Sequence, residues 1–431
     1  MGDGTGTEGG VEQVIADVAC TVCGCVCDDL RVHVRGGRIV RADGACRLAE
    51  PWFLGQDAKH PPTATIEGRA VSLDEAVFRA ADILRDSRAP LIYGLSRSTT
   101  EGQRAAVALA DRVGATIDTT ASLDHAPSII AFQQAGEPTC TLGEVRTRAD
   151  LVIFWGCDPD ATHPRHLERY ARDPLLPFEP ERRREIVYVD VQSPISRRSI
   201  DTFISIDPDR HFEALWTLRN LIRNPSTDSG PLAALAGRMR TCRYGIVFFG
   251  LGLSQVRHGH RNVEALLRLV TDLNAFTRFS ARRLRMQGDV AGADSVLCWQ
   301  TGYPFSVNLA RGYPRYNPGE FSAGEMLARR EADTLLLLGS EYEPRFPPAA
   351  RSYLRTIPTI VLDSPTVEPE FEPTVRFTTA VYGVHRSGTA YRMDEVPIPL
   401  RVLLPSDYPS DADALGAIIA ALTKAAGRVR V

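Results

Sequence analysis

The chain has 431 residues, of which 44% are hydrophobic and 24% are charged. This length is enough for two or more buried cores, and the formal net charge of -3 lacks the basic field typical of a nucleic-acid-binding protein. The N-terminal segment MGDGTGTEGG lacks the pattern of a signal peptide, and apolar runs such as Leu151–Trp155 are too short to span a bilayer. We therefore expect a cytoplasmic protein that binds neither nucleic acid nor a membrane.

Residues 1–60 predict a polar tail followed by a small cysteine-rich β module. Five of the nine cysteines lie here, and two alternating apolar segments flank Gly36-Gly37, a pattern typical of a β-hairpin. In a cytoplasmic protein, clustered cysteines indicate metal binding rather than disulfides.

Four of these cysteines follow the spacing C-x2-C-x3-C-x18-C, at Cys20, Cys23, Cys27 and Cys46. Four thiolates are the usual ligands of a [4Fe–4S] cluster. A tetrahedral zinc site is one alternative, although zinc sites usually bring two C-x2-4-C pairs and the second pair is missing here. The other alternative is a loop that keeps the cysteines and holds no metal. Cys25 is needed by neither metal site.

Residues 61–431 predict an α/β body of two or more Rossmann-like subdomains. Short apolar runs alternate with longer helical patterns, which favours doubly wound, mostly parallel sheets with helices on both faces. A helix is expected from Asp411 to Ala426, with no C-terminal β-barrel. The expected strands are Pro90–Gly94, Leu151–Gly156, Ile186–Val191, Gly245–Gly250, Ser295–Trp299, Thr334–Gly339 and Thr359–Asp363.

Three of the expected strands end in unusual residues. Gly94-Leu95-Ser96, Gly156-Cys157-Asp158-Pro159 and Gly339-Ser340-Glu341 each follow a strand. In open α/β sheets, ligands bind beyond the carboxyl ends of the strands, and glycine turns there permit close approach to a phosphate or a ring. An ordinary strand-to-helix turn has the same composition, so each segment also has a purely structural interpretation.

Five longer motifs, in this order, resemble the tungsten- or molybdenum-binding B subunit of formylmethanofuran dehydrogenase, in the molybdopterin oxidoreductase superfamily. They are CTVCGCVCDDL (Cys20–Leu30), ATIDTTASLDHAPS (Ala115–Ser128), WGCDPDATHPRH (Trp155–His166), QTGYPFSVNLARGYPRYNPGEF (Gln300–Phe321) and SGTAYRMDEVPIPLR (Ser387–Arg401). The resemblance covers nearly the whole chain. It implies formate dehydrogenase/DMSO reductase-like domains, with a cluster that passes electrons to a metal held by two pyranopterin guanine dinucleotides.

The resemblance also implies which residues contact the pterin cofactor: Gly94, Ser96, Cys157, Asp158, His163 and Asp190. Asp190 ends an expected strand, where its carboxylate could pair with a guanine edge or could cap a turn. His163 has the alternative of an ordinary buried or surface histidine.

The sequence departs from the family at two places. A Cys-His pair, whose cysteine ligates the metal, normally lies in the segment that matches Ser122–Pro127; here Asp124 takes the cysteine position and His125 is retained. An active-site arginine normally stands in a Met-Arg-Gly context, which here reads Met286-Gln287-Gly288. Asp124, His125 and Gln287 are therefore expected to form the remnant of a catalytic site.

These departures predict the loss of formate redox chemistry. Tungsten and molybdenum in such sites favour soft sulfur donors, whereas a carboxylate is hard, although some molybdenum enzymes of the superfamily use an aspartate ligand. Gln287 can donate hydrogen bonds but supplies no charge to hold formate or carbon dioxide.

The combination resembles the B subunit of the formyltransferase/hydrolase complex of one-carbon metabolism. That resemblance implies a non-redox scaffold beside a hydrolase-type A subunit, a C subunit, a formyltransferase D subunit and a methanofuran-like carrier. Two alternatives stay open: an active tungsten or molybdenum pterin dehydrogenase subunit with a [4Fe–4S] cluster, and an electron-transfer module that keeps the cluster without the pterin. Metal analysis separates them, because iron alone indicates the module and no metal indicates the scaffold.

Overall fold

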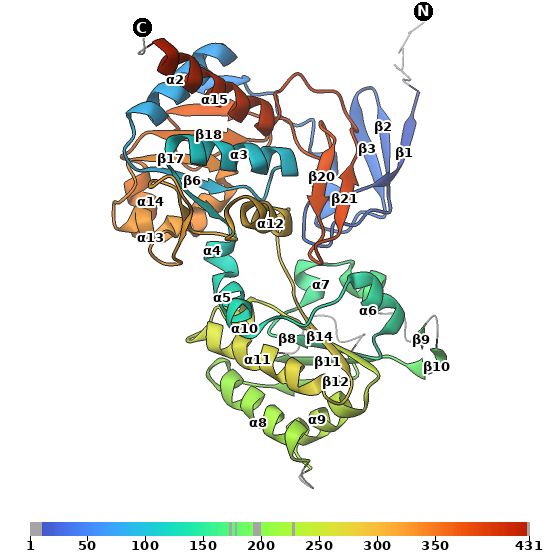
Figure 1. Cartoon of the computed structure of the whole chain (residues 1–431). Coiled ribbons are helices and arrows are strands. Elements are labelled where there is room, and N and C mark those ends of the chain that lie inside the picture. Colours follow the sequence, from blue (N-terminus) through green and yellow to red (C-terminus); the bar gives the residue numbers. More distant parts are fainter. Residues whose placement is uncertain (1–10, 172–174, 177–178, 193–199, 226–228, 429–431) are drawn as a thin grey trace, which may run out of the picture.

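A computed structural model describes residues 11–171, 175–176, 179–192, 200–225 and 229–428. The chain has a mixed α/β architecture in two lobes, with a small β module beside the first lobe (Figure 1). The first lobe is built on a nine-stranded sheet and the second on a five-stranded sheet. No helix among the described residues has the length and apolar character needed to cross a bilayer.

The N-terminal module is an antiparallel sheet of β1 (Gln13–Val18), β2 (Leu30–Arg35) and β3 (Arg38–Asp43). β2 and β3 meet at Gly36 and Gly37, whose φ angles of +56° and +75° are left-handed values that glycine adopts at least cost. The predicted hairpin is therefore confirmed. The cysteines lie in the β1–β2 connection and between β3 and helix α1 (Ala49–Leu54).

The nine-stranded sheet has a parallel centre and antiparallel edges. Its parallel strands are β7 (Thr116–Thr119), β6 (Pro90–Gly94), β17 (Thr334–Leu338), β18 (Thr359–Asp363) and β19 (Val375–Thr378). The edges are β15 (Val307–Asn308) and β16 (Arg315–Tyr316) on one side, and β4 (Ala64–Ile66) and β5 (Arg69–Ala70) on the other. The central strands are continuous apolar runs because helices cover both faces of the sheet.

One face of this sheet carries α2 (Leu73–Asp86), α3 (Thr100–Val113), α12 (Val290–Thr301) and α15 (Asp411–Arg428). The other face carries α13 (Ala323–Ala328) and α14 (Pro348–Leu354). Between β19 and α15 the chain forms a hairpin of β20 (Gly388–Tyr391) and β21 (Pro397–Leu400), which packs on the N-terminal module.

The five-stranded sheet is parallel throughout, in the order β12 (Thr202–Ser205), β11 (Glu185–Asp190), β8 (Leu151–Trp155), β13 (Tyr244–Phe249) and β14 (Arg278–Arg283). Helices α5 (Ala126–Ala135), α8 (His211–Arg223), α9 (Pro231–Thr241) and α11 (Gly259–Leu273) cover one face. The other face packs against α6 (Leu142–Arg148) and the cysteine-bearing loop of the N-terminal module.

The mixed α/β class with parallel sheets is confirmed, as are six of the seven expected strands. The strand expected at Ser295–Trp299 is wrong, because these residues lie inside α12. Asp289 caps that helix by accepting from Gly292 N at 2.8 Å, and Gly302 ends it. A short apolar run fits a strand and a buried helix equally well, and here the flanking caps decided.

The end of β6 gives a first prediction. Gly94 has a φ of +116°, and a Cβ there would lie 2.2 Å from the Leu338 carbonyl oxygen of β17. Gly94→Ala is therefore expected to lower the free energy of unfolding by at least about 2 kcal/mol, which urea denaturation followed by circular dichroism would detect. Gly237→Ala in α9 is the matched control: no atom lies within 4 Å of a Cβ there, and helix propensity favours alanine. Equal midpoints for the two variants would contradict this prediction.

Candidate functional site

Loops from both lobes and from the N-terminal module meet at the carboxyl ends of the parallel strands. The Ser96 carbonyl, two residues after β6, accepts from Asp289 N at 2.7 Å. The neighbouring Gly288 N donates to the carbonyl of Val22, in the cysteine-bearing loop, at 3.2 Å. The connection from β14 to α12 is thereby fixed between the first lobe and the cysteines.

Asp124 lies at the end of α4 (Ala121–Asp124), the short helix after β7, and is 6% exposed. Arg345 ends the 3-10 helix Ser340–Arg345, which follows β17. The Arg345 guanidinium contacts both carboxylate oxygens of Asp124: Nη1 donates to Oδ2 at 2.6 Å, and Nη2 donates to Oδ1. This bidentate geometry satisfies both oxygens and neutralises the buried charge. The carboxylate at the position expected for a metal-binding cysteine thus already has a cationic partner.

His125 follows Asp124 and is also buried. Burial, followed by the nearby charges of Arg285 and Arg283, lowers the pKa of its imidazole well below the usual value. The ring is therefore neutral at physiological pH, with one nitrogen able to donate and the other to accept a hydrogen bond. His125 contributes polarity to the site but no charge.

Gln287 is exposed and has a left-handed φ of +41°. Three buried arginines precede it: Arg282, Arg283 and Arg285 are 4%, 6% and 5% exposed. Arg285 lies 3.6 Å from Asp294 and 3.4 Å from Glu395. The segment therefore keeps fixed positive charge just before Gln287. Sequence reasoning missed these arginines, although the run Arg282-Arg283-Leu284-Arg285 is unusually basic for the end of a buried strand.

Cys157, Asp158 and Asp190 lie at the carboxyl ends of β8 and β11 in the second lobe. Each has a local partner. Cys157 Sγ donates to the Phe248 carbonyl at 3.6 Å, Asp158 caps helix α7 (Pro159–Thr162), and Asp190 Oδ1 accepts from the next backbone N–H at 2.6 Å. These contacts account for all three residues structurally, and a role toward a cofactor stays a prediction.

His163 joins the second lobe to the β14–α12 connection. Its Nε2 contacts the Arg285 carbonyl at 2.6 Å, and its Nδ1 contacts Thr162 Oγ1 at 2.8 Å. Because the carbonyl can only accept, Nε2 carries the proton. Among the residues predicted to contact a pterin, His163 therefore bonds to the connection that leads from β14 to α12 in the first lobe.

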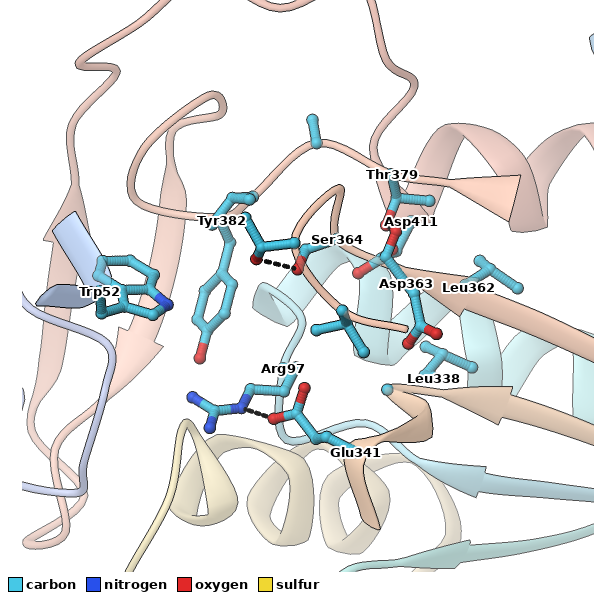
Figure 2. A pocket seen from close by; sticks show the side chains of 15 residues that line it. Trp52, Arg97, Leu338, Glu341, Leu362, Asp363, Ser364, Thr379, Tyr382 and Asp411 are labelled. Carbon is cyan, nitrogen blue, oxygen red and sulfur yellow. Dashed lines mark hydrogen bonds and ion pairs between the residues drawn. The ribbon is translucent and has the colours of Figure 1, made fainter. Parts of the chain in front are cut away.

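The strand ends of the first lobe enclose a cavity of about 140 Å³. Figure 2 shows Arg97 paired with Glu341, with the Tyr382 ring pointing toward the Arg97 guanidinium and Trp52 beyond it. Asp363, at the end of β18, accepts from Ser340 N at 2.7 Å and Ser340 Oγ at 2.6 Å. Cofactor pockets usually measure roughly 300–1,000 Å³. Side chains of the chain itself therefore occupy much of this crevice.

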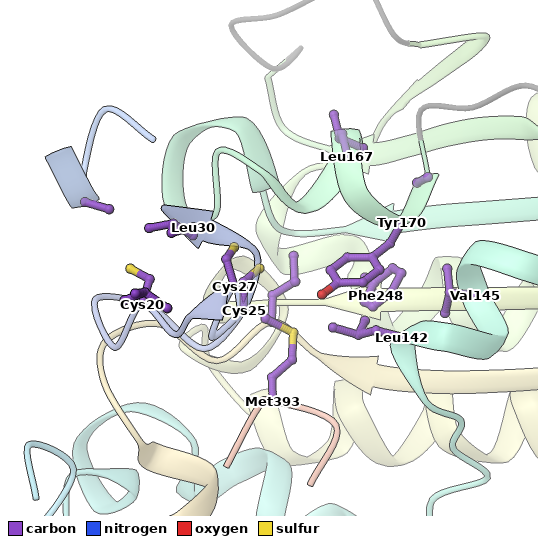
Figure 3. Packing of buried hydrophobic residues seen from close by; sticks show 14 of the residues in the cluster. Cys20, Cys25, Cys27, Leu30, Leu142, Val145, Leu167, Tyr170, Phe248 and Met393 are labelled. Atoms are coloured by element: carbon purple, nitrogen blue, oxygen red, sulfur yellow. The ribbon is translucent and has the colours of Figure 1, made fainter. Parts of the chain in front are cut away.

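The four predicted metal ligands lie on the wall of one small cavity. Cys20, Cys23, Cys27 and Cys46, with Cys25, line one small cavity, which we call the cysteine cavity. In Figure 3, Cys25 and Cys27 lie beside Met393 and near Tyr170. A hydrogen bond from Cys25 lowers the pKa of Cys23 to about 6, whereas burial raises the pKa of Cys27 to about 12.

The two metal centres predicted from the sequence, a zinc ion and a [4Fe–4S] cluster, fit the cysteine cavity differently. Within the described ranges, no three His, Cys, Asp or Glu side chains are placed to hold a single metal ion, which gives no support to the zinc alternative. Four cysteine thiolates are the ligand type that a [4Fe–4S] cluster uses, and four of the cysteines that line this cavity are the predicted ligands. The donor set therefore fits a cluster by ligand type, and its binding stays a prediction.

No protein-family model matches the chain. The chain is similar to the B subunit of the tungsten-containing formylmethanofuran dehydrogenase 2 of Methanocaldococcus jannaschii, with 35% identity over 435 residues, 94% of this chain and 98% of the relative. The protein of the same name from Methanococcus maripaludis is 32% identical over 426 residues. The B subunit of the formyltransferase/hydrolase complex Fhc of Methylorubrum extorquens is 28% identical over 286 residues, 65% of this chain and 76% of the relative.

The fold is also that of a solved structure. The formyltransferase/hydrolase complex FhcABCD from Methylorubrum extorquens, in complex with methylofuran, contains a chain that matches with a TM-score of 0.72. The match covers 84% of this chain and 99% of that chain at 24% identity. At this identity, the likeness establishes a shared fold.

His166 gives a prediction about pH. It is buried with its ring edge-on to Phe154, Tyr170 and Phe248, and neither ring nitrogen has a hydrogen-bond partner among the described residues. Burial lowers its pKa to about 3, so the folded chain keeps it neutral while the unfolded chain protonates near pH 6.5. Its contribution to stability is therefore complete above pH 6.5 and is lost progressively on acidification.

We expect His166→Phe to reduce this loss. Between pH 6.5 and pH 5, the free energy of unfolding of the variant should improve relative to wild type by about 1.5 kcal/mol. Urea denaturation at the two pH values measures the difference. His60→Phe is the control, because His60 is 72% exposed. A pH dependence identical in the His166 variant and wild type would contradict the assignment.

Proposed function

The chain belongs to the family of the formylmethanofuran dehydrogenase B subunits, as its 35% identity over 94% of its length to a member shows, and we propose that it is the B subunit of a formyltransferase/hydrolase complex. In this proposal, the chain is a non-redox scaffold in one-carbon metabolism, in the cytoplasm. Its body is a pair of formate dehydrogenase/DMSO reductase-like domains from which the formate chemistry has been lost.

The observation that carries this proposal is the ion pair of Asp124 with Arg345. A carboxylate is already a poor donor for tungsten or molybdenum. Here both of its oxygens accept from Arg345. A metal would have to displace the guanidinium and leave it without its partner in a half-buried position, which is costly.

The first-lobe crevice also fits a pterin cofactor poorly. Arg97 is paired with Glu341, and Asp363 is bonded to Ser340, so groups that could recognise a nucleotide already have partners within the chain. A pterin guanine dinucleotide would have to open these contacts and enlarge a cavity of about 140 Å³. We therefore assign no reaction step to tungsten, molybdenum or a pterin in this chain.

The proposed partners follow from the relatives. The matched solved structure is the complex FhcABCD with methylofuran, and one curated relative is the B subunit of that kind of complex. We propose that this chain assembles with a hydrolase-type A subunit, a C subunit and a formyltransferase D subunit, which act on a methanofuran-like carrier.

A second candidate function is favoured by the cysteine cavity. Four thiols on one cavity are a costly feature to keep in a cytoplasmic scaffold, because exposed or reactive thiols oxidise. In this candidate, the chain keeps a [4Fe–4S] cluster, which would supply one-electron transfer, without the pterin. Iron in anaerobically purified protein, with neither tungsten nor molybdenum, would favour this candidate over the metal-free scaffold.

Loss of formate chemistry is directly testable. Complex purified anaerobically from its native host is expected to contain no tungsten or molybdenum and to reduce no viologen dye with formate, while formyl transfer and hydrolysis persist. Elemental analysis and dye reduction are the measurements. Robust formate-dependent dye reduction that disappears in Asp124→Ala would instead establish Asp124 as a metal ligand and overturn the non-redox assignment.

The scaffold role predicts stable association. A tagged copy of the chain, expressed in its native host, should co-purify with subunits that carry the hydrolase and transferase activities. Deletion of the gene should lower both activities, because an obligate interface supports its partners. Recovery of a stable monomer, with both activities unaffected by the deletion, would remove the case for a scaffold.

A further inference from the structure

A guanidinium lies against the cysteine cavity on the side of the second lobe. Arg165, between α7 and the π-helix Leu167–Ala171, is one of the residues that line the cavity, and its side chain is 14% exposed. Its Nη1 lies 3.6 Å from the point where a Cβ on Gly44 would stand. The cation therefore lies close to the turn that leads into Cys46.

Two carboxylates hold this cation in place: Asp29, two residues after Cys27, and Glu168, whose Oε1 accepts from Arg165 Nη2 at 3.0 Å. The Glu168 side chain is 51% exposed and does not line the cavity. Asp29 accepts from Arg165 Nη1 at 2.7 Å and from Nη2 at 2.8 Å, and Asp28 accepts from Arg169 Nη2 at 2.6 Å. The Asp29 side chain is 46% exposed and is not among the residues that line the cavity. Solvent therefore screens the carboxylate more than it screens the guanidinium, and the charge nearest the sulfurs is positive.

We infer that Arg165 is a positioning residue for the cysteine cavity and raises the reduction potential of a [4Fe–4S] cluster bound there. Reduction adds one electron to the cluster, and a fixed cation nearby stabilises the more negative, reduced form. Arg169 acts in the same direction, since its guanidinium is held beside Arg165 by hydrogen bonds to Asp28 and Asp29. The inference rests on the second candidate function, in which the cluster is present.

The experiment uses the complete chain in its complex, reconstituted anaerobically with ferrous iron and sulfide and titrated with dithionite while EPR follows the reduced cluster. Arg165→Gln should shift the midpoint potential to a more negative value, and Arg165→Lys, which keeps the charge, should shift it less. Asp29→Asn should shift it to a more positive value. Arg38→Gln is the matched control, since Arg38 is 72% exposed, lies in the same module and pairs with Asp57.

Opposite shifts in the Arg165 and Asp29 variants separate electrostatics from damage, because a merely structural role would move both potentials in the same direction or remove iron from both. An unchanged midpoint in Arg165→Gln, or a negative shift in Asp29→Asn, overturns the inference and leaves the cluster proposal standing. Failure of the wild-type chain to incorporate iron overturns both. If Arg165→Gln does not fold, the sign of the Asp29→Asn shift decides.

Discussion

Burial of charge is the constraint that shapes the strand ends of the first lobe. An ionised group removed from water needs a partner with good geometry, and removal of one member of a buried pair costs about 3–5 kcal/mol. The chain meets this requirement within itself: Asp124 pairs with Arg345, Arg97 with Glu341, and Arg285 faces Asp294. The first two pairs join segments that lie 221 and 244 residues apart in the sequence. They hold the strand ends of the first lobe together.

The same constraint explains how the cysteine-bearing loop is held. On the second lobe, Arg165 forms an ion pair with Asp29 and Arg169 forms one with Asp28, the two aspartates that follow Cys27. On the first lobe, Arg97 Nη1 reaches the Thr21 carbonyl at 3.4 Å. The loop is thereby fixed by cations from both sides, while its apolar residues pack under the five-stranded sheet. A metal centre there would be rigidly placed, in a field set by the protein.

Sequence identity favours the dehydrogenase B subunits, whereas the chemistry of the residues around Asp124 favours the formyltransferase/hydrolase B subunit. Identity is higher to the B subunits of the tungsten-containing dehydrogenases than to that of the formyltransferase/hydrolase complex. Yet Asp124, at the position where the resemblance predicts a metal-binding cysteine, is a carboxylate held by Arg345. A conserved fold reflects the packing of two sheets and their helices, whereas function depends on a few groups at strand ends. The change at Asp124 therefore weighs more for function than the shared length of the alignment.

Local patterns in the sequence were sufficient for much of the fold. Six central strands were predictable because strands buried on both faces are continuous apolar runs, and the hairpin at Gly36-Gly37 because its turn requires left-handed backbone. β14 was missed since its sequence RFSARR reads as a polar surface segment, although five of its six residues are buried. The segment Ser295–Trp299 was misassigned because five residues do not distinguish a strand from a helix.

The sequence by itself also determined the cysteine set and the substitution at Asp124, since both depend only on residue identity and spacing. The tertiary structure alone decided their surroundings. Arg345 lies 221 residues from Asp124, and Arg165 lies 136 residues from Asp29, so neither pair leaves a local signal. Charge partners across such separations are selected by where the strands end in space. For that reason the sequence predicts a changed ligand at Asp124, and the fold shows that Arg345 holds this carboxylate.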